Sequence, residues 1–464
     1  MKDFTKPWQW RSQTLQNRTA TEIFTALFIK ENIATLLESP HVADPEYPQL
    51  SRYSICAGSP RIVDGKQQLW TPGIGQILPF LRSLLQQTIT TTNNPEIAHL
   101  PFTGGWLGWL GYDLAWEIES LPSLNQDTLP FPVAYWYEPE CFAVLDHLEQ
   151  TLWLAASEPS QLDDLETKLC SQSPSPPLPQ SPVPSPQSQI YFLTSQEQYQ
   201  NAVRQAKKYI QAGDIFQANL SLRFQTQTNC DSWSIYTQLQ QINPSPFASY
   251  WRLPWGDVIS CSPERLVKLK GNKAQTRPIA GTRRRGFDLA GDRALATELL
   301  ANTKELAEHI MLVDLERNDL GKVCQWGSVE VDELLVIERY SHVMHLVSNV
   351  KGTLQSDYDA VDLIRGVFPG GTITGCPKVR CMEIIEELEP VRRSLFYGSC
   401  GYLDCRGNLD LNILIRTLLY TKSKGENFAR VYGQVGAGIV ADSDPEREWY
   451  ESLNKAEAQI AALQ

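Results

Sequence analysis

The chain has 464 residues, of which 42% are hydrophobic and 20% charged; this is the composition of a globular protein and excludes disorder throughout. The formal net charge is -12 and no Lys/Arg-rich stripe occurs, so the electrostatic footprint of a nucleic-acid-binding protein is missing. An acidic protein that binds an anion must concentrate positive charge locally, and the densest group is Arg283, Arg284 and Arg285.

The cysteines and the N-terminal residues indicate a reducing compartment. The ten cysteines are scattered without a CxxC pair, which favours free thiols over disulfides or a zinc site. Residues 1–17 lack an apolar core segment, and no apolar run of 18 residues occurs in the chain. We therefore expect a cytoplasmic protein that does not interact with membranes.

Residues 1–170 form the first predicted region, in which short apolar runs such as residues 150–156 predict strands. Residues 102–114, FTGGWLGWLGYDL, place four glycines among aromatic residues; we favour a packed strand and turn there, with a ligand-binding loop as the alternative. Residues 171–188 contain seven prolines and predict an extended, exposed linker. The length itself predicts two domains, or one large sheet-based domain with an insertion.

Residues 189–464 form the second predicted region. Apolar periodicity predicts a helix over residues 196–212 closed by Gly213, and then a strand at IFQANLSLRF. A helix is also predicted over residues 292–317, with one buried face formed by Leu295, Leu299, Leu306, Ile310 and Leu315. Short β-rich runs follow at residues 329–331, 399–403, 411–419 and 429–433. Because there is no regular βαβ rhythm, we expect an α+β fold with antiparallel sheet.

Three glycine-rich segments of the second region are candidates for anion binding. They are RPIAGTRRRG (277–286), FPGGTITGCPK (368–378) and GQVGAGIVADSDPE (433–446). Such loops point backbone N–H groups at an anion, although turns use glycine as well. None is a Walker A motif or a GxGxxG sequence that opens a helix, so nucleotide binding is not supported.

Carboxylates are the second candidate group. Glu305 and Glu308 fall in the predicted helix 292–317, and a further helix is predicted to begin at Asp444-Pro445. In that helix Glu448 and Glu451 are three residues apart and therefore share a face, where they could hold one hard cation or simply be solvated.

The pair His342 and His345 lies in ERYSHVMHLVSNV. Residues three apart share a face only in a helix, so joint zinc ligation requires a helix at this point. The other interpretations are a general acid or base and a hydrogen-bonded core histidine.

Five segments in order resemble the chorismate-utilising enzymes, specifically component I of anthranilate synthase and aminodeoxychorismate synthase. The segments are RPIAGTRRRG, EHIMLVDLERNDLGKVC, ERYSHVMHLVS, FPGGTITGCPKVRCMEIIEELEP and GAGIVADSDPEREWYESLNKA, and the match runs from about Gln196 to Leu463. LLES (36–39) and residues 102–114 match more loosely. The resemblance implies a large antiparallel β-sheet sandwich flanked by helices.

The resemblance also implies a role for individual residues. Mg²⁺ would be held by Glu308 and Glu451, with Glu448 close by, and would bind a chorismate carboxylate. Arg416 would clamp the other carboxylate, since a guanidinium binds bidentately. Catalytic roles are implied for His345, Lys455 and Thr372. Substrate contacts are implied for Gly281, Thr282, Gly436, Ala437, Gly438 and Lys378, and for Phe396, which stands where the family usually has an aromatic hydroxyl.

The implied reaction adds ammonia at C2 of chorismate with loss of the C4 hydroxyl, and elimination of pyruvate then yields anthranilate. A glutamine amidotransferase partner would supply the ammonia, since the chain has no recognisable Cys-His-Glu glutaminase motif. Rival interpretations are an isochorismate or salicylate synthase, which uses water, and a catalytically silent subunit that only binds an amidotransferase.

The choice between the two aminating families depends on Ala280. Aminodeoxychorismate synthases typically place there a lysine that attacks C2; alanine cannot form that adduct, which favours anthranilate. GDIFQANLSLRF, NPSPFASYW and DLNILIRT look more like aminodeoxychorismate synthase, which stays the alternative. Feedback by tryptophan is similarly divided. Ser39 matches a tryptophan-contacting position, while Pro246, Phe247 and Ala248 replace the usual Pro-Tyr-Met, so we expect weak or constitutive binding.

Overall fold

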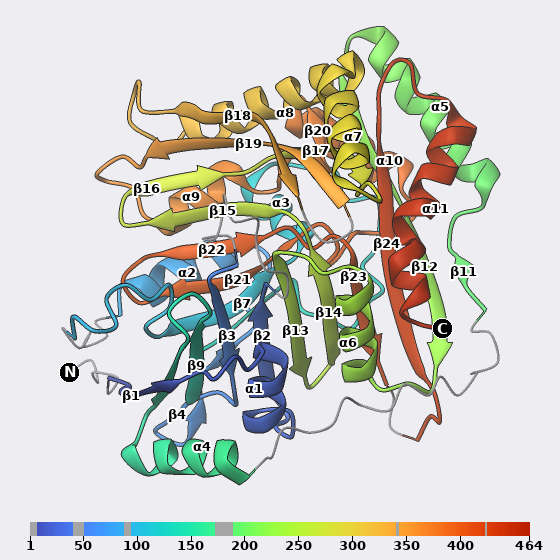
Figure 1. The fold of residues 1–464 in the computed structure, drawn as a ribbon. Coiled ribbons are helices and arrows are strands. Elements are labelled where there is room, and N and C mark those ends of the chain that lie inside the picture. Colours follow the sequence, from blue (N-terminus) through green and yellow to red (C-terminus); the bar gives the residue numbers. More distant parts are fainter. Residues whose placement is uncertain (1–6, 40–50, 88–93, 172–188, 340–342, 423–424) are drawn as a thin grey trace.

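The computed structural model describes residues 7–39, 51–87, 94–171, 189–339, 343–422 and 425–464 (Figure 1). Its strands form two large antiparallel sheets with helices on the outside, which confirms the predicted α+β class. No helix in these ranges is both long and apolar enough to cross a bilayer. The helices are α1 (Ala20–Leu27), α2 (Ile77–Leu85), α3 (Ala115–Ile118), α4 (Pro159–Ser171), α5 (Gln196–Ala212), α6 (Ser232–Ile242), α7 (Leu289–Ala301), α8 (Thr303–Gly321), α9 (Ala360–Val367), α10 (Lys378–Leu388) and α11 (Pro445–Ala461), with short turns η2 (Tyr112–Leu114) and η3 (Gly371–Ile373).

The first sheet combines strands from both halves of the chain. In spatial order it contains β1 (Gln9–Thr14), β10 (Thr151–Ala156), β9 (Cys141–Asp146), β3 (Tyr53–Ala57), β2 (Ala34–Glu38), β13 (Phe247–Leu253), β14 (Gly256–Ser262), β23 (Thr417–Thr421), β24 (Ala429–Ile439), β12 (Gln217–Thr228) and β11 (Tyr191–Phe192), while β20 (Gly375–Cys376) also pairs with β12.

The second sheet is built in the same way. Its order is β17 (Ile279–Arg284), β19 (Val343–Thr353), β16 (Lys273–Thr276), β15 (Arg265–Lys270), β22 (Leu409–Asn412), β21 (Ser399–Asp404), β7 (Gly105–Leu110), β8 (Ala134–Tyr137) and β6 (Leu69–Trp70), with β18 (Glu330–Arg339) paired to β19, and a separate hairpin joins β4 (Ile62–Val63) to β5 (Lys66–Gln67). Since β2 pairs with β13 and β7 with β21, residues before 171 and after 189 share both sheets. Apart from Ser171, which ends α4, the predicted linker 171–188 lies outside the described residues.

Two apolar cores hold these layers together. Between the sheets, Trp109 of β7 and Trp251 of β13 meet edge to face with ring centroids 5.9 Å apart. On the outer face of the first sheet, helices α1, α5, α6 and α11 cover a second core. Figure 1 shows α5 and α11 lying along β12 and β24, the strand pair that carries the third glycine-rich segment.

Two of the crossovers at which the chain passes from one sheet to the other are adjacent. One joins β14 to β15 through Pro263 and Glu264, and the other joins β22 to β23 through residues 413–416. The two crossovers are linked, because the backbone N–H of Ile413 donates to the carbonyl oxygen of Glu264 at 3.0 Å. The prediction of one strand over residues 411–419 is therefore wrong: it breaks where the chain changes sheets, and Arg416 takes a positive φ of 51°.

Other local predictions had mixed outcomes. The helix 196–212 is confirmed as α5, with a capping box at Ser195 and Gly213 at φ 82°. α11 begins after Asp444 as predicted. The single helix predicted over 292–317 is wrong, because Asn302 ends α7 and caps α8 by accepting from the Glu305 N–H at 3.2 Å. Ile310, predicted to be buried, is 40% exposed.

The glycine-rich stretch 102–114 contains the packed strand β7. A Cβ atom on Gly108 would lie 2.6 Å from the Trp136 ring, so the glycine permits close packing of β7 on β8. All ten cysteines are free thiols.

Candidate active site

His345 lies on β19 opposite Thr282 of β17, and Thr282 Oγ1 and His345 Nδ1 share a hydrogen bond of 3.0 Å. The imidazole is only 2% exposed. Burial, and then the positive charge of Arg416, lower the pKa of His345 to about 3. The ring is therefore neutral at physiological pH. Because His345 is in a strand and His342 lies outside the described residues, the helical zinc pair has no support.

A β-bulge at Gly281 shapes this edge of the sheet. Ala280 pairs with Leu346 and Thr282 with His345, so Gly281 is the extra residue. It takes a φ of 59°, and a Cβ atom there would lie 2.2 Å from Glu305 Oε2. The glycine thus allows the Glu305 carboxylate of α8 to approach the backbone of β17. Ala280 is half-buried beside the bulge.

Arg416 stands at the second crossover, between the two sheets. Its Nη1 donates to Asn243 Oδ1 at 3.2 Å, and burial lowers its pKa. The guanidinium is close enough to lower the pKa of both His345 and Glu264 by its charge. A half-buried guanidinium near a neutral histidine is a suitable partner for a substrate carboxylate.

Glu264, at the first crossover, was not singled out from the sequence. It is 5% exposed, and burial raises its pKa to about 7, although the Thr372 hydroxyl and Arg416 act in the opposite direction. A carboxyl group with such a pKa is suited to donate a proton near neutral pH. The only sequence signal was a glutamate beside Pro263 between two apolar runs, a pattern that surface turns share.

Residues 433–439 of the third glycine-rich segment lie in β24 beside β12. Gly436 pairs with Ser221 and Gly438 with Asn219, and a Cβ atom on Gly438 would lie 2.3 Å from Gln217 Nε2. The side chain of Ala437 faces the opposite way, into the core beneath the helices, so only its backbone is available to a ligand. Lys455 of α11 donates to the Gly436 carbonyl oxygen at 3.1 Å.

Several buried polar side chains gather around β24 and the crossovers. Among the described residues, side-chain oxygens that are buried without a hydrogen-bond partner include Gln217 Oε1 and Asn219 Oδ1. In the same region Glu264 interacts with Thr372, and Tyr397 with Ser221. Thr372 is tied to this group because Asn219 Nδ2 donates to its carbonyl oxygen at 3.3 Å. Buried polar groups in native proteins find partners in protein, water or ligand, so this concentration favours a polar occupant.

Two pairs of carboxylates face each other across α8 and α11. Burial raises the pKa of Glu308, and the charges of Glu451 and Glu305 raise it further. Burial likewise raises the pKa of Glu448, as does the charge of Glu451. The predicted ligands of the two helices are thus close enough to repel one another. Glu305, placed in the same helix but not among the predicted ligands, shares the α8 face with Glu308.

Two of these four carboxylates form ion pairs with lysines. Lys304 lies 3.7 Å from Glu308, and Lys455 lies 2.9 Å from Glu451. Within the residues that the structure describes, no three His, Cys, Asp or Glu side chains converge closely enough to hold an ion in this arrangement. The donor set nevertheless fits Mg²⁺, because it offers hard carboxylate oxygens and because Glu305 Oε2 and Glu448 Oε2 are buried without hydrogen-bond partners.

Several sequence-predicted groups are engaged elsewhere. The ammonium group of Lys378 is bound by Asp319 at 2.5 Å and by the Val367 carbonyl oxygen at 2.9 Å. Phe396 is buried with the Arg223 guanidinium 5.5 Å from its ring centroid.

The predicted positive patch is neutralised in the same way. Arg283 pairs with Glu305 at 2.8 Å and Arg285 with Asp292 at 2.6 Å, so two of the three arginines already have acidic partners. The positive charge that this group leaves for an anionic ligand is correspondingly reduced.

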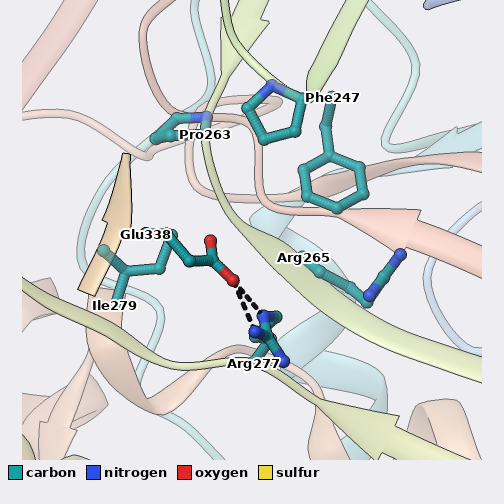
Figure 2. Close-up of a pocket in the computed structure, with 7 residues that line it drawn as sticks. Phe247, Pro263, Arg265, Arg277, Ile279 and Glu338 are labelled. Carbon is teal, nitrogen blue, oxygen red and sulfur yellow. Dashed lines mark hydrogen bonds and ion pairs between the residues drawn. The ribbon is translucent and has the colours of Figure 1, made fainter. Parts of the chain in front are cut away.

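Two of the four predicted regulatory residues line a small pocket (Figure 2). Its volume is about 10 Å³, which is room for one water molecule. Figure 2 shows Glu338 and Arg277 joined by hydrogen bonds at one side of it. Ser39 and Ala248 do not line it, and the Ala248 side chain lies in the core beneath the helices. The lining residues are Pro246, Phe247, Pro263, Arg265, Arg277, Ile279 and Glu338.

Comparisons with known proteins identify the family of the chain. A family model described as chorismate binding enzyme matches residues 45–461. The chain is 63% identical over 464 residues to the "Anthranilate synthase component I-like protein" of Synechocystis sp. (strain ATCC 27184 / PCC 6803 / Kazusa), covering 99% of this chain and 92% of that protein. It is 44% identical over 431 residues to "Aminodeoxychorismate synthase component 1" of Bacillus subtilis (strain 168), covering 89% of each.

The same Synechocystis strain has a separate protein named "Anthranilate synthase component 1", to which this chain is 42% identical over 416 residues, covering 84% of this chain and 81% of that protein. Among solved structures, anthranilate synthase component I from Streptococcus pneumoniae TIGR4 superposes with a TM-score of 0.75 at 31% identity, covering 88% of this chain and 92% of that chain.

Proposed function

Because the chain belongs to the chorismate-binding enzyme family, we propose that it is component I of an anthranilate synthase, which aminates chorismate with ammonia and eliminates pyruvate. One observation carries the proposal: Arg416 lies within electrostatic reach of both His345 and Glu264, at the point where the two crossovers meet. An anion-binding group thus stands beside a neutral base and beside an acid that is protonated near neutral pH.

Each of these three residues has a part in the reaction. Arg416 binds one substrate carboxylate and orients the ring between the sheets. Glu264 in its protonated form donates a proton to the departing C4 hydroxyl, which leaves as water. His345, held by Thr282, then accepts the proton that is lost when pyruvate is eliminated. Both transfers use the protonation states that the two side chains have below pH 7.

Glu308 and Glu451 would hold Mg²⁺, with Glu448 and Glu305 beside them. The ion would act as a Lewis acid on the second carboxylate of chorismate. Lys304 and Lys455 would have to release their ion pairs for this binding to occur. After losing its ion pair with Glu451, Lys455 would keep its hydrogen bond to the Gly436 carbonyl oxygen and so hold α11 against β24.

Ala280 supports anthranilate as the product. Its methyl group offers no amine for covalent attack on the ring, so ammonia itself must be the nucleophile at C2. The second candidate is aminodeoxychorismate synthase component I. The two Synechocystis relatives favour it. That strain has one protein named "Anthranilate synthase component 1", at 42% identity, and the chain is more similar, at 63%, to a different protein of the strain whose name says only "component I-like".

The test is the product formed from chorismate, ammonium and Mg²⁺ by the purified protein. Anthranilate is expected, identified by its fluorescence and mass. A released isomer that keeps the enolpyruvyl group and carries the amine at C4 would establish the second candidate. Turnover that does not depend on ammonium would instead indicate an isochorismate or salicylate synthase. Absence of any Mg²⁺-dependent chorismate consumption would indicate a silent subunit.

The in-cell nitrogen source is, in this proposal, a glutamine amidotransferase subunit in the cytoplasm. Support comes from the word "component" in the names of the relatives and from the missing glutaminase motif. Tryptophan is expected to bind weakly, because Pro246, Phe247 and Ala248 replace the Pro-Tyr-Met that is usual in the family. Tight, inhibitory tryptophan binding in calorimetry would contradict this expectation.

A further inference from the structure

The side-chain amide of Asn243, directly after α6, connects β14 to the end of the second crossover. Its Oδ1 accepts a hydrogen bond from Arg416 Nη1 at 3.2 Å, and its Nδ2 donates to the Cys261 carbonyl oxygen at 3.3 Å. A guanidinium can only donate and a backbone carbonyl can only accept, so these two partners allow a single orientation of the amide. Asn243 therefore presents a fixed acceptor to Arg416.

These bonds belong to a closed loop that starts and ends at Arg416. The backbone N–H of Cys261 donates to the Arg416 carbonyl oxygen at 3.2 Å, and the carbonyl oxygen of the same cysteine receives the Asn243 amide. The backbone and the guanidinium of Arg416 are thus both tied to β14. This support matters because Arg416 takes a φ of 51°, in the left-handed region that is uncommon for residues other than glycine.

The side chain of Asn243 is not required to end α6. The backbone N–H of Asn243 donates to the Leu239 carbonyl oxygen at 2.8 Å and completes the last turn of the helix. The half-buried amide is used instead at the crossover. The sequence thus places an asparagine where its backbone closes a helix and its side chain reaches a cation.

The orientation of the guanidinium decides how well it can bind a carboxylate. The bond to Asn243 uses one of its five N–H donors and leaves the Nε–Nη2 edge, which can form two parallel bonds to a carboxylate. An arginine side chain has several rotatable bonds, so an untethered guanidinium loses more conformational freedom when a ligand binds. A guanidinium that is held before the ligand arrives binds it at a smaller entropic cost.

We propose that Asn243 is a positioning residue, whose side-chain amide orients the Arg416 guanidinium for a carboxylate of the substrate. This inference rests on the proposed function, since the substrate is the same, and it adds a residue that acts through Arg416. A purely structural role for Asn243 would change the stability of the protein and leave the affinity for chorismate as it is.

The test compares Asn243→Ala with Asn125→Ala in the full chain. Asn125 is half-buried as well, and its Nδ2 donates to the carbonyl oxygens of Glu386 and Glu389 at 2.6 and 2.9 Å, on and just after α10 rather than at the crossovers. Melting temperatures are measured together with steady-state kinetics against chorismate and against ammonium at saturating Mg²⁺.

For Asn243→Ala we expect KM for chorismate to rise about 5-fold or more, because the binding of a carboxylate is weakened while the chemical groups remain. The kcat should stay within two-fold of wild type, and KM for ammonium should be unchanged. Asn125→Ala should lower the melting temperature and leave all three kinetic constants unchanged.

Asn243→Asp is a second variant that keeps the shape of the side chain. The aspartate still accepts from the guanidinium, but its negative charge forms an ion pair that competes with the substrate carboxylate for Arg416. We expect KM for chorismate to rise about 10-fold or more, above the value for Asn243→Ala. Asn125→Asp serves as its control and should not change this KM.

A chorismate KM within two-fold of wild type in both Asn243 variants would overturn the proposal, whatever the loss of stability. If the wild-type protein turns over no chorismate, the proposed function fails. Calorimetric titration of the same variants with chorismate then decides the inference. A selective loss of affinity in the Asn243 variants supports it, whereas equal affinities, or no binding of chorismate by the wild-type protein, contradict it.

Discussion

At the residue scale, Glu451 is half-exposed on α11, yet its charge raises the pKa of Glu308 on a different helix. Glu451→Gln keeps the side-chain shape and removes one hard oxygen donor. We expect kcat/KM to fall about 100-fold or more, with an unchanged melting temperature, in assays that titrate Mg²⁺. Glu457→Gln, an exposed site on the same helix, should behave as wild type. Full turnover of Glu451→Gln at saturating Mg²⁺ would remove Glu451 from the metal site.

Ala280 is the second residue whose replacement is informative, because it adjoins the bulge at Gly281. Ala280→Lys places an amine beside the ring, and we expect the product to shift toward the 4-amino isomer, measured by chromatography with mass detection. Ala280→Met adds similar bulk without an amine and should slow the reaction without changing the product. If lysine leaves the product profile unchanged, Ala280 does not select the nitrogen position.

Glu264 predicts the alkaline limit of activity. Its pKa is raised to about 7, chiefly by burial, so the proton donor is present below pH 7 and is lost as the pH rises through that value. Glu264→Gln should lower kcat by roughly 10²–10⁴-fold and abolish this alkaline limb in a pH-rate profile. Glu38, whose pKa is also about 7, hydrogen-bonds to Tyr236 at 2.5 Å on α6. Glu38→Gln should retain the alkaline fall in activity. If this variant also lost that fall, the titration could not be assigned to Glu264.

The sequence predicted some of these residues and not others for a definite reason. Glycine clusters and glutamates three apart on a helix form patterns, so Gly436 and Glu451 could be selected before the structure was known. Glu264 is a single residue whose chemistry comes from burial and from neighbours distant in the chain. No local sequence pattern reports such a pKa shift.

At the scale of elements, the break between α7 and α8 places the acidic pair of α8. Asn302 accepts from the Glu305 N–H, so it fixes the first turn that carries Glu305 and precedes Glu308. Asn302→Ala should destabilise the fold by about 1 kcal/mol and raise the Mg²⁺ concentration needed for half-maximal activity. Urea unfolding and Mg²⁺ titration measure the two effects.

Asp231→Ala provides the matched control, because Asp231 caps α6 in the same way and accepts from the Ser234 N–H. It should cost similar stability without altering the response to Mg²⁺. An equal Mg²⁺ response in the two variants would mean that the α8 cap acts only through global stability.

The two breaks that the sequence did not reveal have different causes. Apolar spacing continues through Asn302, and asparagine is tolerated inside helices, so only its capping geometry marks the boundary. Residues 411–419 read as one apolar strand, because the change of sheet is imposed by tertiary pairing. The elements with strong local signals, such as α5 with its capping box and glycine, were predicted to the residue.

At the scale of the whole molecule, buried carboxyl groups make stability depend on pH. Burial raises the folded-state pKa of Glu38 to about 7, so its contribution is full below the unfolded pKa near 4.5 and is lost as the pH rises through 7. The free energy of unfolding should therefore fall between pH 5.5 and 8.5 (roughly the span of that titration), and Glu38→Gln should reduce the fall by about 2 kcal/mol. Urea unfolding at both pH values measures this, and an undiminished fall in the variant would contradict it.

Pairings between distant segments could not be derived from the sequence. β2 pairs with β13, and β7 with β21, although a proline-rich segment separates the partners in the chain. Alternating apolar residues identify strands but do not specify which strands pair, since every such strand presents the same backbone groups. The class of the fold was therefore predictable, whereas the sharing of both sheets by the two regions was not.

The crossover from β22 to β23 is short, so it restricts the movement of one sheet relative to the other. Arg416 sits at its end, and Ile413 at its start is bonded to the other crossover. Any sliding of one layer over the other must displace the guanidinium, so an anion held there would resist such shear. We expect a bound dicarboxylate to slow amide hydrogen exchange in both β-sheets at once, because the ligand would hinder the relative movement of the two sheets.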